Sequence, residues 1–156
     1  MGLLAVLFVA VDQIIKWLVE TNLEFQTLVD VIPFLGLYRT WNQGIAFSML
    51  WGLDDRALIG LTVLIIGFVG FLAWQTRPEN RIIRLGFTAI IGGAIGNLID
   101  RAVYGHVVDY VLFHTPVWSF AVFNLADAFI SVGAALVILA EFLDWRKSRI
   151  HDQKPD

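Results

Sequence analysis

The chain has 156 residues, of which 58% are hydrophobic and 16% are charged, so it is far more apolar than an ordinary soluble domain. Its net charge of −3 comes without any basic block, which argues against a nucleic-acid-binding protein. Cysteine is absent, which excludes disulfides, thiolate metal sites and a cysteine nucleophile. These properties indicate a membrane protein.

Four apolar runs follow one another along the chain, and each is long enough to cross a hydrocarbon core of ~30 Å at ~1.5 Å rise per residue. The first run lacks the basic start and the small-residue cleavage site of a secretory signal, so we interpret it as a membrane helix. We predict a single membrane domain over residues 1–156, with helices at about 1–19, 57–75, 82–99 and 125–143.

The connection between the first two runs is too apolar for a disordered loop and too interrupted for a span. Residues 25–32 and 34–41 are rich in β-branched and aromatic side chains and flank Pro33, which predicts two short strands. A turn signal follows at Asn42 to Gly44, and residues 45–51 can form a short interfacial helix. We therefore expect a small β segment at about 25–51 beside a four-helix bundle.

Basic residues are distributed unevenly among the connections. Arg77, Arg81 and Arg84 separate the second and third runs, and four more basic residues follow the fourth run, whereas the other two connections contain only Arg39, Arg56 and Arg101. The positive-inside rule then places both termini in the cytoplasm and the β segment outside.

Small residues in the third run predict close helix packing. Gly92, Gly93 and Gly96 form a face that allows a neighbouring helix to approach. The small residues at 131 and 133–135 in the fourth run make that run a candidate neighbour.

Five polar residues lie inside or at the ends of the apolar runs, all toward the predicted outer face: Asp12, Lys16, Asn97, Asp100 and Asp127. An ionised group in hydrocarbon is costly unless it is paired or faces water, so such residues are candidates for a functional site. Arg101 and Asn124 lie three or four residues from members of this set, and Asp109 follows in a loop that can reach it.

Each of these residues also has a purely structural interpretation. Asp12 and Lys16 are spaced as a helix-stabilising ion pair, and Asn124 with Asp127 fits a helix-capping arrangement. Asp109 alone could be a solvated loop carboxylate. Asp100 opposes the dipole of its helix, so we expect it to pair with Arg101 or Lys16.

Two carboxyl groups held close in a partly dry site share a proton, which suits hydrolysis of an amide. The sequence contains neither Gly-x-Ser-x-Gly nor His-Glu-x-x-His. A mixed metal site of His106, Asp109 and His114 is a weaker alternative, because their spacing matches no known ligand pattern.

Two further classes of protein fit four helices with acidic residues. A proton-coupled transporter would place its acidic residues near the membrane midplane, unlike the outer placement expected here. A noncatalytic membrane assembly factor would tolerate isosteric changes from Asp to Asn.

The chain carries five ordered motifs: Asp12-Gln13-x-x-Lys16, Asn42-Gln43-Gly44-x-Ala46-Phe47, Gly92-Gly93-x-x-Gly96-Asn97-Leu98-x-Asp100-Arg101, Val107-Val108-Asp109 and Phe123-Asn124-x-Ala126-Asp127. Together they resemble, over nearly the whole chain, the motifs of bacterial lipoprotein signal peptidase, also called signal peptidase II. The resemblance implies four membrane helices with an extracytoplasmic β-cradle and an interfacial helix. It also implies an aspartyl protease of the inner membrane that removes the signal peptide of a prolipoprotein, cutting before the lipid-modified cysteine of the lipobox.

By the same resemblance, the catalytic pair would be Asp109 and Asp127. The polar groups lining the site would be Asn97, Arg101 and Asn124, with Asp100 supporting Arg101. Asp12 and Lys16 would stabilise the outer end of the first helix, and Asn42 and Gly44 would lie in the loop that approaches the substrate. We expect a monomer in contact with membrane lipid, acting on prolipoproteins without a cofactor or metal, with its active site toward the extracytoplasmic face.

Overall fold

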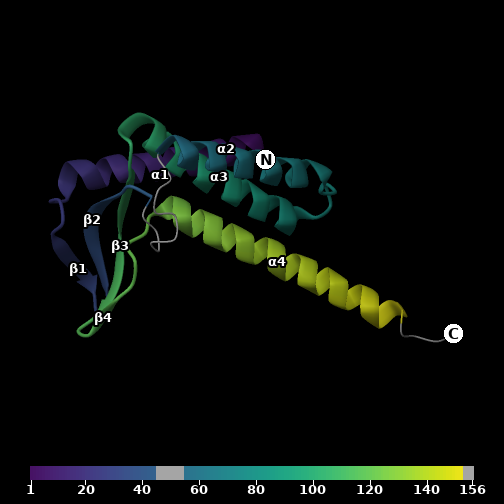
Figure 1. Cartoon of the computed structure of the whole chain (residues 1–156). Helices are drawn as coiled ribbons and strands as arrows, with labels where there is room; N and C mark the ends of the chain where they lie inside the picture. The colour runs from purple at the N-terminus through teal and green to yellow at the C-terminus, as the bar shows by residue number, and fades with distance from the viewer. Residues whose placement is uncertain (45–54, 153–156) are drawn as a thin grey trace.

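The computed structural model describes residues 1–44 and 55–152 of the chain. Its helices are α1 (Gly2–Asn22), α2 (Asp55–Gln75), α3 (Arg81–Tyr104) and α4 (Leu125–Asp152). Its strands are β1 (Leu28–Ile32), β2 (Leu35–Asn42), β3 (Val107–Thr115) and β4 (Trp118–Ser119). The helices pack side by side, and the strands form a sheet at one end of them (Figure 1).

All four helices are long and apolar enough to cross a membrane, so the chain is a multi-pass membrane protein. The predicted fold class, a four-helix membrane bundle with a small sheet, is confirmed. The helices extend past the predicted apolar limits, to Asn22 in α1, Tyr104 in α3 and Asp152 in α4. Gly105, at a φ of 72°, ends α3 in the left-handed conformation. The predicted interfacial helix at 45–51 lies outside the described residues.

Helix α3 is the centre of the bundle, and it packs against each of the other three helices. Its glycines permit this contact on two sides. A Cβ on Gly92 or Gly96 would collide with Phe8 or Asp12 of α1, whereas one on Gly93 would collide with Ala126 of α4. The predicted glycine face is therefore shared between two neighbours, and α4 also approaches closely at its own Gly133, which meets Gly86.

Gly96→Leu should be strongly destabilising, because even the first carbon of the new side chain would meet the Asp12 carboxylate. Overpacking of a tight interface costs about 1–3 kcal/mol, and here it also displaces a buried charge. We expect a lower melting temperature and a large loss of activity. Gly60→Leu is the matched control, because nothing lies within 4 Å of its Cβ position. Equal melting temperatures for the two variants would show that α1 and α3 do not pack through Gly96.

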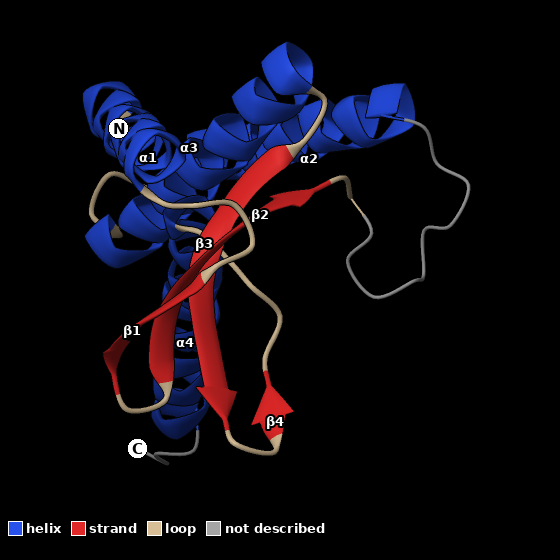
Figure 2. Cartoon of the chain, turned by 90° about the vertical axis from the view of Figure 1, so that its left-hand side faces the viewer, coloured by secondary structure: helices blue, strands red, loops and turns tan. Residues whose placement is uncertain are grey.

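The sheet is antiparallel, with the strand order β1-β2-β3-β4 (Figure 2). The two strands predicted on either side of Pro33 are β1 and β2, which pair as an antiparallel hairpin, and Phe34 in its turn has a φ of 72°. The segment carrying Asp109, which the sequence suggested to be a loop, is strand β3. The run of β-branched and aromatic residues from Val107 to Phe113 was the available signal.

Arg39 of β2 joins the sheet to the end of α1. Its Nη1 donates to the main-chain carbonyls of Glu20 at 3.0 Å and Leu23 at 3.1 Å, carbonyls that the end of a helix leaves without helical partners. Its guanidinium also lies over the rings of Phe25 and Trp41. Strand β2 is thereby fixed against the same helix that carries Asp12 and Lys16.

Candidate active site

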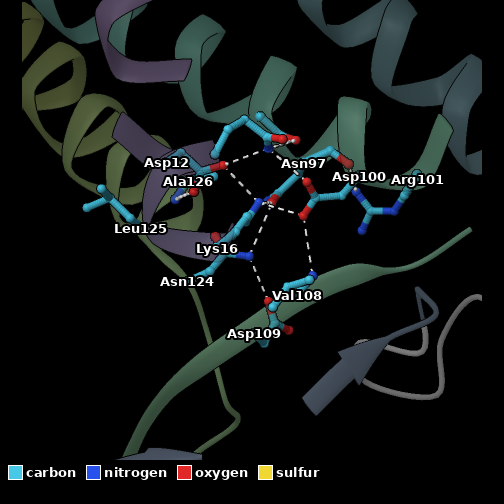
Figure 3. A network of polar contacts seen from close by, with 12 residues as sticks. Asp12, Lys16, Asn97, Asp100, Arg101, Val108, Asp109, Asn124, Leu125 and Ala126 are labelled. Carbon is cyan, nitrogen blue, oxygen red and sulfur yellow. Dashed lines mark hydrogen bonds and ion pairs between the residues drawn. The ribbon is translucent and has the colours of Figure 1, made fainter. Parts of the chain in front are cut away.

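Lys16 is the hub of a buried polar network between α1 and α3 (Figure 3). Its Nζ donates to Asp12 Oδ2 at 2.9 Å, Asp100 Oδ2 at 2.8 Å and Asn97 Oδ1 at 2.9 Å. The exposed fractions of Lys16, Asp12 and Asp100 are 3%, 0% and 1%. An ammonium group has three protons to donate, and each of them has an acceptor here, as a buried cation requires.

Lys16 also sets the orientation of Asn97. A lysine can only donate, so the Asn97 side-chain oxygen must face it, and the amide nitrogen must then face away. That nitrogen donates to Asp127 Oδ1 at 2.8 Å. The network thus transmits the position of Lys16 to a carboxylate at the start of α4.

Asn124 connects the two candidate catalytic carboxylates. Its Nδ2 donates to Asp109 Oδ1 at 2.6 Å and to Asn97 Oδ1 at 3.1 Å. Its Oδ1 accepts from the Asp127 main-chain N–H at 2.9 Å, and its own main-chain N–H donates to Asp127 Oδ2 at 3.2 Å. Both carboxylates line one cavity of about 870 Å³. The structure therefore brings Asp109 of β3 and Asp127 of α4 to the same site.

The first turn of α4 is capped by side chains from three elements. Besides Asn124, Asp12 Oδ1 accepts from the Ala126 N–H at 3.0 Å, and Tyr110 Oη accepts from the Leu125 N–H at 3.2 Å. Burial raises the pKa of Tyr110 to about 12, so the phenol keeps its proton. The capping and functional interpretations of Asn124 are thus compatible, because the contacts that cap α4 also position Asp127. Sequence reasoning missed Tyr110, which has no motif signal of its own.

Asp109 accepts hydrogen bonds at both carboxylate oxygens. The second donor is Asn42 Nδ2, which lies 3.0 Å from Asp109 Oδ2. The Gly44 N–H in turn donates to Asn42 Oδ1 at 2.8 Å. Burial, followed by the nearby charge of Asp127, raises the pKa of Asp109 to about 6, although Asn42 and Asn124 favour its charged form.

Asp109→Asn should stabilise the folded protein above pH 6. The native carboxyl has a pKa of about 6, against 3.8 in the reference state, so its contribution to stability is full below pH 4 and is lost as the pH rises through 6. The wild-type protein therefore loses about 3 kcal/mol of stability at high pH. The amide variant avoids this loss, but its mismatched hydrogen bond costs about 1 kcal/mol. We expect a melting temperature higher by a few degrees at pH 8, measured in detergent, and no gain at pH 4. An unchanged pH dependence in the variant would contradict the raised pKa.

The other predicted residues divide between the network and the cavity. Asp100 pairs with Lys16, not Arg101, and it also accepts from Gln13 Nε2 at 2.8 Å and the Val108 N–H at 3.3 Å. Arg101 lines the cavity, and its Nη1 makes one long contact of 3.4 Å with the Asn97 carbonyl. The guanidinium is thus available to a ligand in the cavity.

The two histidines of the alternative metal site lie at opposite ends of β3. His106 packs against the ring of Trp41 with 4.6 Å between centroids, and His114 Nε2 lies 2.8 Å from Asp30 Oδ1. Neither imidazole converges on Asp109. Within residues 1–44 and 55–152, no group of three or more His, Asp or Glu side chains is arranged to hold a metal ion.

Comparison with known proteins gives a consistent picture. A family model described as signal peptidase (SPase) II matches residues 4–143. The lipoprotein signal peptidase of Mesorhizobium japonicum is 61% identical over 146 residues, which cover 94% of this chain and 87% of that protein. That of Brucella ovis is 59% identical over 145 residues, covering 93% and 91%. A bacterial membrane enzyme solved by the in meso method at 2.3 Å resolution superimposes with a TM-score of 0.82 at 28% identity, covering 99% of this chain and 91% of that one.

Proposed function

This chain belongs to the signal peptidase II family, and from that membership we propose that it is an intramembrane aspartyl endopeptidase that removes the signal peptide from diacylglyceryl-modified prolipoproteins. It cuts the peptide bond before the lipid-modified cysteine of the lipobox. The observation that carries the aspartyl mechanism is that Asn124 holds Asp109 and Asp127 in one cavity.

The two carboxyl groups take different parts in the reaction. Asp109, whose carboxyl group takes up a proton as the pH falls through its raised pKa of about 6, is the acid that protonates the scissile carbonyl oxygen. Asp127 lies in the first turn of α4, where the helix dipole favours negative charge, and is the base that takes a proton from the attacking water. As the tetrahedral intermediate collapses, Asp127 gives the proton it took from water to the leaving nitrogen, and Asp109 takes back the proton on the former carbonyl oxygen. The C–N bond breaks, which leaves a carboxyl group on the signal peptide and an amine on the cysteine. Carboxyl groups alone supply this chemistry, without a metal or cofactor.

The remaining polar residues hold the pair and the substrate. Asn97 and Asn124 fix the two carboxylates, and Lys16, Asp12 and Asp100 fix Asn97 and the start of α4. Asn42, held by the Gly44 N–H, supports Asp109. Arg101 faces the substrate in the cavity. We propose that the enzyme acts as a monomer.

The position of Asp109 supports a peptidase over a transporter. Asp109 lies on a strand beyond the end of α3, whereas coupling residues of transporters lie near the membrane midplane. The aromatic wall of the cavity, formed by Phe113, Phe120 and Phe123, provides an apolar surface for the signal helix and its neighbouring lipid.

We place the enzyme in the bacterial inner membrane, with both termini cytoplasmic and the active site toward the extracytoplasmic face. Arg77 lies between α2 and α3, and Arg81 and Arg84 lie in the first turns of α3. Together with the basic residues late in α4, they support this orientation. A reporter fused at the carboxyl terminus or inserted at Glu79 should report the cytoplasm, and one at Asp30 the outside. An outside signal at Glu79 would reverse the assignment.

The direct test is incubation of the purified protein with a lipid-modified prolipoprotein. We expect release of the signal peptide, insensitivity to metal chelators and little cleavage of the same substrate without its lipid. No release would contradict the proposed activity. Release that stops with EDTA and returns with a divalent metal would contradict the aspartyl mechanism alone.

A further inference from the structure

A groove lies between the start of α1 and the start of α3, at the end of the bundle opposite the sheet. It has a volume of about 310 Å³, and its lining includes Leu4 of α1 and Leu85 of α3, with Arg81 and Arg84 also along it. No acidic residue is among those that line it. The groove thus combines an apolar surface with two positive charges.

The positive charges around this groove have few acidic partners in the protein. The stretch from Arg77 to Arg84 contains three arginines and one acid, Glu79. Within residues 1–44 and 55–152, none of the three arginines forms an ion pair. Arg84 Nε donates to Met1 Sδ at 3.2 Å, and a thioether is a weak acceptor. An anionic ligand would supply the stronger acceptors that the arginines lack.

The depth of the groove matches the membrane boundary. The apolar part of α3 begins at Ile82, so Arg81 and Arg84 lie in the first turns of the span, where their side chains reach the headgroup region. Beyond Met1 and Leu4, an apolar hollow of about 600 Å³ continues along α1 past Leu7 to Ala10. A molecule with a phosphate at the arginines and a hydrocarbon chain along α1 would fit both parts.

We propose that this groove binds one anionic phospholipid, with its phosphate between Arg81 and Arg84 and an acyl chain against Leu4 and Leu85. Arginine suits this role because its planar guanidinium donates two parallel hydrogen bonds to phosphate oxygens. The uncompensated charge favours a headgroup of net negative charge over a zwitterionic one. This site is separate from the carboxylate pair, so it does not depend on the proposed function.

The test compares phosphatidylglycerol and phosphatidylcholine with identical acyl chains. The purified full chain in detergent is titrated with each lipid, and bound lipid is counted by native mass spectrometry. We expect phosphatidylglycerol to bind at least about tenfold more tightly. Each arginine contributes about fivefold, so Arg81→Gln with Arg84→Gln should weaken phosphatidylglycerol binding by about 25-fold. The control, Arg146→Gln with Arg149→Gln on α4, removes the same charge elsewhere and should retain full binding.

A second variant tests the groove without changing its charge. Leu85→Trp fills the apolar surface, and we expect it to lose phosphatidylglycerol binding while it keeps both arginines. Retained binding in this variant would place the lipid elsewhere and overturn the proposal. Equal affinity for the two lipids, an equal loss in the α4 control, or tight binding of glycerol 3-phosphate without acyl chains would also overturn it.

Discussion

Asp109→Asn and Asp127→Asn should each lower the rate of signal-peptide release by at least about 10³-fold, with the folded protein still in the membrane. An amide keeps the shape of the carboxyl group, but it can neither accept the proton of the attacking water nor donate a shared proton. Asn124 and Asn97, which contact the two carboxylates, still have an oxygen to donate to in each variant. The measurement is the single-turnover cleavage rate at matched protein concentration.

The double variant distinguishes a cooperating pair from two independent residues. If Asp109 and Asp127 act as a unit, the double variant should be scarcely slower than either single variant, because groups that act together are strongly non-additive. Asp144→Asn, at an exposed position late in α4, is the control and should retain full activity. Substantial turnover by either catalytic variant would contradict the aspartyl mechanism.

Lys16→Met should cause the largest loss of stability, about 3–5 kcal/mol, because it leaves two buried carboxylates without their cation. Asp12 and Asp100 keep only hydrogen bonds from neutral groups in this variant. Activity should fall as well, because the Asn97 oxygen loses its Lys16 donor and is then held away from Asp127 more weakly, by Asn124 Nδ2 at 3.1 Å. Thermal unfolding in detergent measures the first effect, and the cleavage rate below the new melting temperature measures the second.

Lys147→Met is the matched control for this prediction. Lys147 also pairs with an aspartate on its own helix, at 3.7 Å from Asp144, but its side chain is 79% exposed. Exposed pairs contribute about 0–1 kcal/mol, so this variant should unfold at nearly the wild-type temperature. Similar losses in the two variants would show that Lys16 is not a buried hub.

The sequence was most informative where burial makes a residue costly. Asp12, Lys16, Asn97 and Asp100 stood out because charged and amide groups in apolar runs need partners, and the structure supplies those partners from one another. The ends of the apolar runs predicted the membrane spans, because polar residues are costly inside the hydrocarbon. The hydrophobic pattern alone therefore predicted four helices and the end at which their polar residues meet.

The sequence was less informative where an interaction depends on how two elements are oriented when they pack. Asp100 could have paired with Arg101 or Lys16, and only the rotation of α3 against α1 decides for Lys16. Strand β3 pairs with β2, more than sixty residues earlier, so the spacing of nearby residues could not predict this pairing. The residue types of Tyr110 and Gln13 do not indicate a function. Their roles come from tertiary contacts: Tyr110 caps the start of α4, and Gln13 donates to the Asp100 carboxylate.

The capped start of α4 has a consequence for the cell during synthesis. Asp127 takes its position from Asp12 of the first helix, Asn97 of the third and Asn124 just before the fourth. A nascent chain with only three helices inserted carries Asp109 but no partner for it. On the proposed mechanism the protein gains activity only when its last helix has entered the bilayer, and we expect an incomplete copy to cut no neighbouring membrane protein.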